Sequence, residues 1–248
     1  MPEFIFGREE ELQALRRRFR KRKPFLLHGP SGVGKTFLVR RILREFPGVL
    51  YSSESPSAQA VFRNLAVSLL AAPDPGLLRA FGSSGGEGIE RKSALALKGL
   101  VMDALHAGHY CAVLDHLRRP AYSCAAAVRE IMGWGNTPVV ALARSPHMED
   151  LGFLHAFYPD RSDRLELRNF PPPLAQRFAE EAVRRAGLSA QNMSEFLQRV
   201  LVFSQGNPGA ILSMLEMAKH PKYRSAEHIK ITPLYVDFRL NWKPAGVR

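Results

Sequence analysis

The sequence predicts an α/β fold in which a five-stranded parallel sheet is flanked by helices and followed by a small helical domain. Through residue 167, short apolar segments alternate with segments that carry apolar residues at helical spacing. That alternation is typical of parallel sheets covered by helices. Three consecutive prolines at 171–173 mark the strongest boundary, and the pattern after them is mostly helical. We expect an α/β domain at 1–170, a helical domain at 171–220 and a tail of unknown fold at 221–248.

Each expected strand is a short apolar or alternating run that precedes a turn signal or a polar residue. The strands are expected at 25–28, 49–52, 110–114, 138–143 and 164–167. The first helix has acidic residues in its first turn, where they favour the helix dipole, and Pro24 stops it. Further helices are expected at 35–45, 58–71, 93–107, 121–133, 173–186, 193–204 and 208–219.

Two segments fall outside this alternation. Residues 73–88 are rich in Pro, Gly and Ser, which indicates a surface excursion because the alternation resumes afterwards. Residues 228–238 look extended, but the pattern gives them no place in the sheet. The sequence contains no internal repeat.

Composition excludes several classes of protein. With 46% hydrophobic residues and only 2 Cys among 248, the chain is neither a disulfide scaffold nor a disordered polar chain. It contains no run of about 18 apolar residues, and its first residues lack the order of a secretory signal, so we expect a cytoplasmic protein without a membrane span. Cys111 lies in an apolar strand-like run and Cys124 in a helix-like one, which predicts two reduced core thiols.

A glycine-rich motif lies between the first strand and the next helix. Its residues are Gly29, Pro30, Ser31, Gly32, Val33, Gly34, Lys35 and Thr36. Glycines allow successive backbone N–H groups to converge on a phosphate at a helix N-terminus. Lys35 would then reach the β- and γ-phosphates, and the Thr36 hydroxyl would bind Mg²⁺. An ordinary glycine turn is the alternative, although a chance match has odds of only about one in a hundred.

Asp115 is the candidate carboxylate for the same metal. It follows the apolar strand at 110–114, at the end where a parallel strand meets the phosphate loop. The alternative is that Asp115 only caps the next helix.

Together these motifs resemble the P-loop ATPases of the AAA+ class, and more closely their STAND or archaeal-ATPase-like branch, over about residues 4–220. The similar segments are 6–12, 29–36, 113–115, Arg144 and 206–208. The resemblance implies ATP and Mg²⁺ as cofactors, Arg8 near the adenine, Pro208 of the helical lid at the nucleotide, and Arg144 sensing the γ-phosphate. It also implies an ATP-dependent homo-oligomer with an arginine finger, for which Arg161 and Arg164 are candidates. Arg144 has a plainer alternative, a surface arginine at the end of a strand.

The sequence departs from this family at two positions. His116 stands where the family usually has an acidic residue that polarises the attacking water. A neutral imidazole can accept a proton but lacks a fixed negative charge, so we expect slow hydrolysis. The alternative is that His116 only packs at a strand end. The family's usual lid arginine is also missing beside 206–208.

Charge leaves the choice of partner open. The formal net charge is +12, and residues 16–23 carry seven cations in eight positions, which favours non-specific DNA binding. The alternative for this run is a solvated helix face. Two function classes therefore stay open: an ATPase that acts as a switch or assembly factor on DNA, and a STAND-type signalling switch that binds ATP or ADP and controls an unidentified protein partner. A small-molecule kinase is the least favoured alternative.

Overall fold

The computed structural model describes residues 6–71, 89 and 92–242, so the Pro/Gly/Ser-rich segment 73–88 lies outside the described residues. Contacts divide the chain into two units. The sheet unit contains Glu11–Gly29 and Lys35–Glu166, and the helical unit contains Met1–Glu10, Pro30–Gly34 and Leu167–Arg248.

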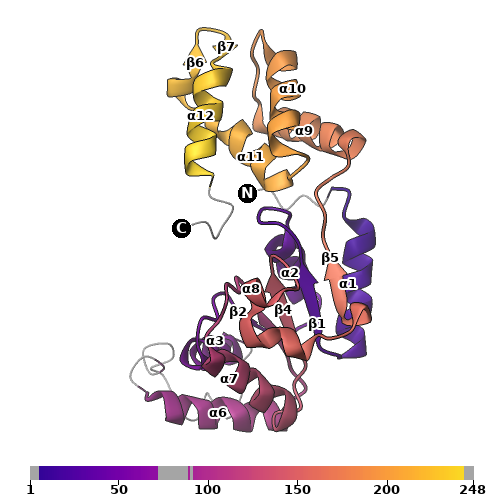
Figure 1. Ribbon diagram of the computed structural model, residues 1–248, viewed down its shortest axis with the longest axis vertical. Coiled ribbons are helices and arrows are strands. Elements are labelled where there is room, and N and C mark those ends of the chain that lie inside the picture. The colour runs from indigo at the N-terminus through magenta and orange to yellow at the C-terminus, as the bar shows by residue number, and fades with distance from the viewer. Residues whose placement is uncertain (1–5, 72–88, 90–91, 243–248) are drawn as a thin grey trace. The chain divides into compact units, whose positions relative to one another are not determined.

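The sheet unit is built on five parallel strands (Figure 1). The strands are β1 (Phe25–His28), β2 (Val49–Ser52), β3 (Cys111–Leu114), β4 (Val139–Ala143) and β5 (Arg164–Glu166), in the order β2-β3-β4-β1-β5. Strand β1 pairs with both β4 and β5, so that Leu27 lies opposite Leu142 on one side and Leu165 on the other. The predicted five-stranded parallel sheet is confirmed.

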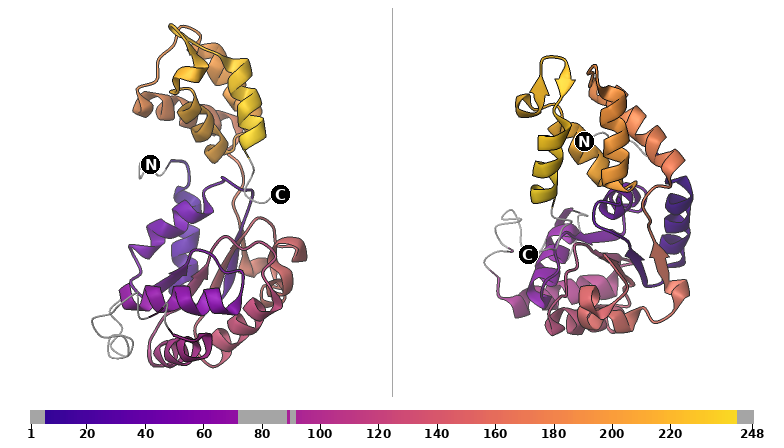
Figure 2. Two further views of the ribbon diagram at one scale, coloured as in Figure 1. Left: turned by 90° about the vertical axis from the view of Figure 1, so that its left-hand side faces the viewer. Right: turned by 45° about the horizontal axis from the view of Figure 1, so that its top comes forward.

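Helices lie on both faces of this sheet, as Figure 2 shows. They are α1 (Glu9–Lys21), α2 (Lys35–Leu43), α3 (Ala58–Ala71), α6 (Ala94–Ala107), α7 (Tyr122–Gly133) and α8 (Met148–Leu151), with short 3-10 helices at Gly152–Phe157 and Arg161–Asp163. Helices α3, α6 and α7 share one core with alternate strand residues such as Ala112 and Leu114. On α1, Phe19 makes an edge contact with Phe25 of β1, whose side chain is not part of that core. The alternation of strand side chains therefore serves two packed faces.

The helical unit contains α9 (Pro172–Ala186), α10 (Met193–Ser204), α11 (Pro208–Met217) and α12 (Ile231–Asn241) around its own core. A 3-10 turn at Pro221–Tyr223 leads to a hairpin of β6 (Arg224–Ser225) and β7 (His228–Ile229).

The expectation that residues 228–238 are extended is wrong for most of that segment, because α12 begins at Ile231. Its β-branched and aromatic residues favour strands, but Leu234 and Phe238 are four residues apart and both buried on one helical face. Pro233 is tolerated because it lies in the first turn, where backbone N–H groups have no partner within the helix. Tertiary packing therefore overrides local propensity here.

Two further expectations concern burial and membranes. Cys111 and Cys124 are free and buried, as predicted for core thiols, and burial raises the pKa of each thiol to about 12. Among the described residues, no helix combines the length and the apolar character needed to cross a bilayer.

Candidate nucleotide-binding site

The glycine-rich motif joins the end of β1 to the start of α2, which is the strand–turn–helix context that the motif requires. The Gly29 amide donates a hydrogen bond to the carbonyl of Arg144 at 3.2 Å, which ties the start of the loop to the end of β4. The ammonium group of Lys35, at the start of α2, donates to the Gly29 carbonyl at 2.6 Å. Burial lowers the pKa of Lys35 to about 8, although the nearby Asp115 carboxylate acts in the opposite direction.

Asp115 follows β3 and is almost fully buried. Its Oδ2 accepts a hydrogen bond from the Thr36 hydroxyl at 2.7 Å, and its Oδ1 accepts one from the His116 amide at 2.6 Å. The structure thus brings together the two side chains that the sequence analysis assigned to a metal. A hydroxyl and a carboxylate fit Mg²⁺, which prefers hard oxygen ligands and leaves its other positions to phosphates and water.

Tyr51 is a residue of this site that sequence reasoning missed. Its hydroxyl donates to the same Oδ2 of Asp115 at 2.7 Å. Tyr51 reaches Asp115 because β2 pairs with β3, with Tyr51 opposite Val113. The available signal was a polar side chain near the end of a strand, but using it required knowing that these two strands are neighbours.

Arg144 follows β4, and its backbone carbonyl accepts the amide of Gly29, the first residue of the glycine-rich motif. Its Nε is 3.3 Å from Oδ1 of Asp150, at the end of the short helix α8. Both charges act on Lys35: Arg144 lowers its pKa and Asp150 raises it. No motif in the sequence indicated Asp150.

His116 occupies the left-handed region of backbone conformation, with φ of +51°. Such a conformation costs an L-residue on the order of 1 kcal/mol. Its ring is about half exposed, and Nε2 lies 3.9 Å from Oδ2 of Asp115. The imidazole therefore lies between the buried Asp115 carboxylate and solvent, where it can contact a water molecule.

Within the helical unit, the tip of the glycine-rich loop is held by residues near the start of α11. The Asn207 side-chain amide donates to the Ser31 carbonyl at 2.9 Å, and the Gly209 amide donates to the Gly32 carbonyl at 3.0 Å. Pro208 stands between these two contacts as the first residue of α11. Gly32 has φ of +80°, and a Cβ there would lie 2.6 Å from Oδ1 of Asn207, so this position requires glycine.

Arg8 belongs to the helical unit and is buried. Its Nη2 donates to the Arg168 carbonyl at 2.6 Å and to the Val33 carbonyl at 3.4 Å, and its guanidinium lies 4.4 Å from the centre of the Phe170 ring. These contacts place Arg8 beside the loop tip. Its role toward adenine stays a prediction.

The two arginine-finger candidates differ in their contacts. The Arg164 guanidinium donates to the carbonyls of Tyr158 at 3.0 Å and Pro159 at 3.1 Å, so it holds its own loop together. Arg161 is exposed. Of the two, Arg161 has the more accessible side chain.

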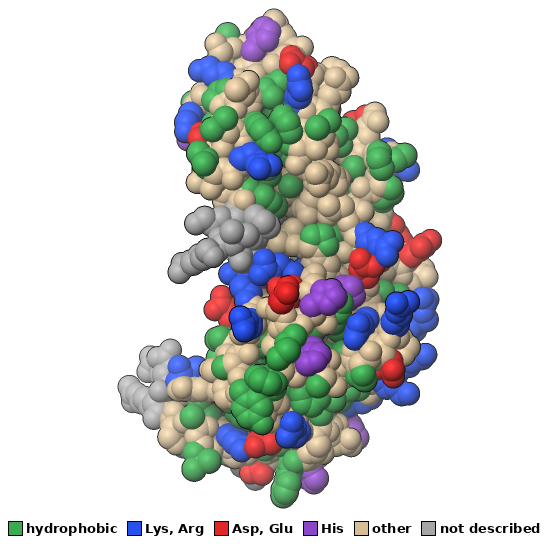
Figure 3. Space-filling model, viewed as in Figure 1, with side chains coloured by type: hydrophobic (Ala, Val, Ile, Leu, Met, Phe, Trp, Pro, Cys, Tyr) green, Lys and Arg blue, Asp and Glu red, His purple; other side chains and the backbone are tan. Residues whose placement is uncertain are grey.

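The basic run at 16–23 separates into two groups. Arg16 forms two hydrogen bonds of 2.7 Å to Glu45, while Arg18 and Arg22 donate to backbone carbonyls of neighbouring segments. The remaining cations of the run are exposed: Arg17, Arg20, Lys21 and Lys23. In Figure 3, Lys and Arg side chains gather on the side of the sheet unit where Figure 1 shows α1.

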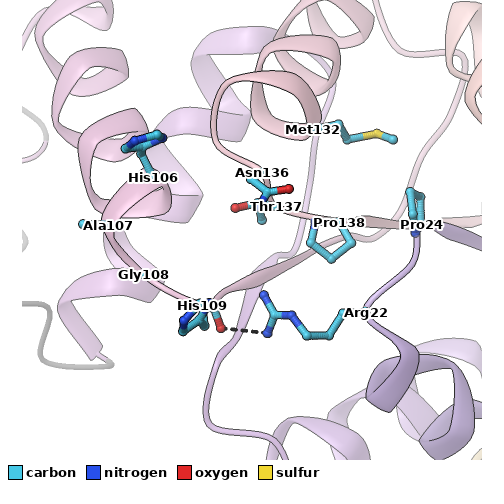
Figure 4. Close-up of a pocket in the computed structure, with 10 residues that line it drawn as sticks. All are labelled: Arg22, Pro24, His106, Ala107, Gly108, His109, Met132, Asn136, Thr137 and Pro138. Carbon is cyan, nitrogen blue, oxygen red and sulfur yellow. Dashed lines mark hydrogen bonds between the residues drawn. The ribbon is translucent and has the colours of Figure 1, made fainter.

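A pocket of about 400 Å³ lies in the same unit at the amino-terminal ends of the strands (Figure 4). Pro24, which precedes β1, and Pro138, which precedes β4, line it together with Arg22, His106 and His109. Lys35 and Asp115 follow their strands instead, at the opposite edge of the sheet. The pocket is therefore separate from the candidate nucleotide site.

Comparison with known proteins agrees with this geometry. Residues 5–205 match the family model described as AAA ATPase domain. The fold is similar to that of the Walker-type ATPase of Pyrococcus abyssi, at 16% identity and a TM-score of 0.63 over 95% of this chain and 73% of that one. It is also similar to the ORC1 protein of Aeropyrum pernix in complex with DNA, at 17% identity and a TM-score of 0.65 over 96% of this chain and 66% of that one.

A third similar structure is Cdc6p of Pyrobaculum aerophilum, at 16% identity and a TM-score of 0.60, over 98% of this chain and 65% of that one. The chain thus spans about two thirds to three quarters of the length of these structures. A comparison with curated proteins finds no significant match.

Proposed function

This chain belongs to the AAA ATPase domain family, and from that premise we propose that it binds ATP with Mg²⁺ at residues 29–36, hydrolyses it slowly and serves as a nucleotide-dependent switch or assembly factor. The observation that carries the proposal is the 2.7 Å hydrogen bond from the Thr36 hydroxyl to the buried Asp115 carboxylate. Thr36 directly follows Lys35 in the chain. In P-loop NTPases, a hydroxyl and a carboxylate in this relation hold the nucleotide's metal.

In this proposal each residue has a separate task. Lys35 binds the β- and γ-phosphates, Thr36 binds the metal directly, and Asp115 accepts hydrogen bonds from the metal's water. Arg144 would exchange its ion pair with Asp150 for a contact with the terminal phosphate. The proposal is supported by the proximity of both side chains to Lys35, whose pKa Arg144 lowers and Asp150 raises. Arg8 is proposed to lie near the adenine and Pro208 to contact the nucleotide; the proposal is supported by their place beside the loop tip within the helical unit.

Slow hydrolysis is proposed because His116 replaces the usual carboxylate. A general base contributes about 10²-fold or more to a rate when its pKa suits the reaction. An imidazole beside Asp115 can orient water but brings no permanent negative charge. The protein would therefore remain in its ATP state long enough to act as a switch.

The test is the His116→Glu variant, assayed for phosphate release from Mg·ATP. We expect turnover to rise by about 10-fold or more, because a carboxylate polarises water more strongly. His116→Asn is the matched control: asparagine tolerates the left-handed backbone but adds no charge, so turnover should not rise. Brisk wild-type turnover that the glutamate leaves unchanged would refute slow hydrolysis by this cause.

A second candidate function, action on DNA, is favoured by the exposed cations of the 16–23 run. The similar ORC1 structure was determined in complex with DNA. Neutralised phosphates release counterions, so the four exposed cations in the second half of α1 and just after it suit a non-specific duplex contact. Without DNA binding, the STAND-type alternative applies, in which the nucleotide state controls a protein partner.

We also propose ATP-dependent self-association, with Arg161 as the residue that reaches a neighbouring subunit's nucleotide. Its exposed side chain supports this role better than the internally bonded Arg164. An arginine supplied in trans stabilises the negative charge of the transferring phosphoryl group.

A further inference from the structure

Tyr51 lies on β2 and is joined to the carboxylate of Asp115 by a hydrogen bond that no phosphate-loop motif requires. Its hydroxyl is 2.7 Å from Oδ2, at the same distance as the Thr36 hydroxyl from that oxygen. Burial and Asp115 raise the pKa of the Tyr51 hydroxyl, whereas the Arg40 side chain, one turn after Thr36 on α2, lies close enough to lower it. Tyr51 is thus held between a cation and the candidate metal carboxylate.

The acceptor sites of Asp115 are nearly all in use. A carboxylate offers about four lone-pair positions, two on each oxygen. Thr36 and Tyr51 occupy Oδ2, and the His116 amide occupies part of Oδ1. Little capacity remains for water molecules bound to a metal, which would have to donate to the same carboxylate.

Only one of these three donors is free to leave. The His116 amide belongs to the backbone directly after Asp115. Thr36 can bind a metal through its oxygen while its proton still points to Asp115. Tyr51 is about half-buried, and its hydroxyl can turn from Asp115 toward solvent while its oxygen stays near Arg40.

We propose that the Tyr51 hydroxyl competes with magnesium-bound water for Asp115, so that Tyr51 weakens the hold of the site on Mg²⁺ and eases release of the Mg·nucleotide product. This inference rests on the proposed nucleotide function and adds a regulatory residue to it. Tyr51 is a positioning residue, since it acts through Asp115 rather than on the phosphates.

The experiment compares Tyr51→Phe with the wild-type full chain by titrating Mg²⁺ into the protein saturated with ADP and following the heat of binding. We expect the apparent dissociation constant for Mg²⁺ to fall by about 10-fold or more, the range of one hydrogen bond to a charged group. The affinity for ADP in EDTA should stay unchanged, because Tyr51 touches no phosphate-binding residue except through the metal site.

Tyr223→Phe is the matched control. Tyr223 also donates to an aspartate, Asp237, at 2.8 Å, but both residues belong to the helical unit and neither is in the candidate site. This variant should leave the Mg²⁺ titration unchanged. Thermal unfolding of both variants shows whether each is folded.

The outcomes separate this inference from the proposed function. If the wild type binds no ADP, with or without Mg²⁺, the proposed function itself fails. If the wild type binds Mg·ADP and Tyr51→Phe has equal or weaker affinity for Mg²⁺, the competition is refuted. Equal changes in Mg·ADP and metal-free ADP affinity would likewise refute it, because they would indicate a general structural effect.

Discussion

Lys35 is poised to gain a proton when a phosphate arrives. Burial is the main reason that its pKa falls from 10.5 to about 8 in the protein without nucleotide. Above pH 8 the free protein therefore holds Lys35 largely neutral. Phosphate oxygens next to the amine favour the charged form and raise the pKa again.

This leads to a prediction for nucleotide binding at pH 8.5. We expect binding to take up roughly three-quarters of a proton, because that fraction of Lys35 is neutral before binding and charged afterwards. Affinity should accordingly decrease as pH rises from 8 toward 10. Calorimetry in two buffers with different ionisation enthalpies measures the uptake.

Lys35→Arg provides the control, since arginine stays protonated throughout this range. Its binding should be weaker, and any binding that remains should take up no proton in this window. Equal proton uptake by the wild type and the arginine variant would assign the proton to another group.

The sequence identified the part of the site that is contiguous or directly follows a strand. Lys35, Thr36 and Asp115 come from such local patterns, and the structure brings them together. Tyr51 and Asp150 reach the same place only through strand order and the packing of α8. Such residues are single polar side chains on separate elements. Because they form no motif with a fixed spacing, the sequence alone does not identify them.

At the scale of elements, the turn before α11 depends on close backbone approach. Gly206 has φ of +73°, its carbonyl accepts the Phe170 amide at 2.9 Å, and a Cβ on Gly206 would lie 2.1 Å from the Phe170 carbonyl oxygen. Any side chain here must move the backbone that leads from β5 into α9.

We therefore predict that Gly206→Ala lowers the free energy of unfolding by more than about 2 kcal/mol, from the positive φ and the clash together. Gly187→Ala is the control, because Gly187 also has positive φ, at +60°, but open space around its Cβ position. It should cost only about 1 kcal/mol. Urea denaturation compares the two, and equal losses would show that the clash is relieved without cost.

Elements with strong local signals were predictable, and those stabilised mainly by packing were not. The five strands follow apolar runs, and helices α1, α2, α3, α6, α7, α9, α10 and α11 follow apolar spacing and Pro or Gly boundaries. The short helix α8 was not among the predicted elements. Helix α12 has strand-favouring residues and becomes helical because Leu234 and Phe238 join the core of the helical unit. The apolar residues of its 11-residue span recur too weakly at helical spacing to predict a helix from the sequence.

For the whole molecule, the net charge of +12 matters less than which cations are available to a partner. Arg16, Arg18 and Arg22 are engaged by protein groups. The hydrogen bond from Arg16 is the main cause that lowers the pKa of Glu45, and the exposed Arg20 adds a smaller effect on the same carboxyl, so it is left in place as part of that cluster. Arg17, Lys21 and Lys23 are exposed without an ion pair among the described residues. A DNA contact through α1 should therefore depend on these three side chains.

The prediction concerns the salt dependence of binding to a duplex of arbitrary sequence. Replacing Arg17, Lys21 and Lys23 by Ser should lower the slope of log affinity against log salt by about 0.9 for each DNA phosphate that these side chains would otherwise neutralise. Fluorescence anisotropy at several salt concentrations measures this slope.

The control replaces three exposed cations of the helical unit, Arg199, Lys230 and Arg239, so that both variants lose the same charge. A smaller slope in the first variant alone assigns the DNA-binding surface to α1, because a general charge effect would lower the slope equally in both. Unchanged binding by the first variant would remove α1 from any role on DNA and favour a switch that acts on a protein partner.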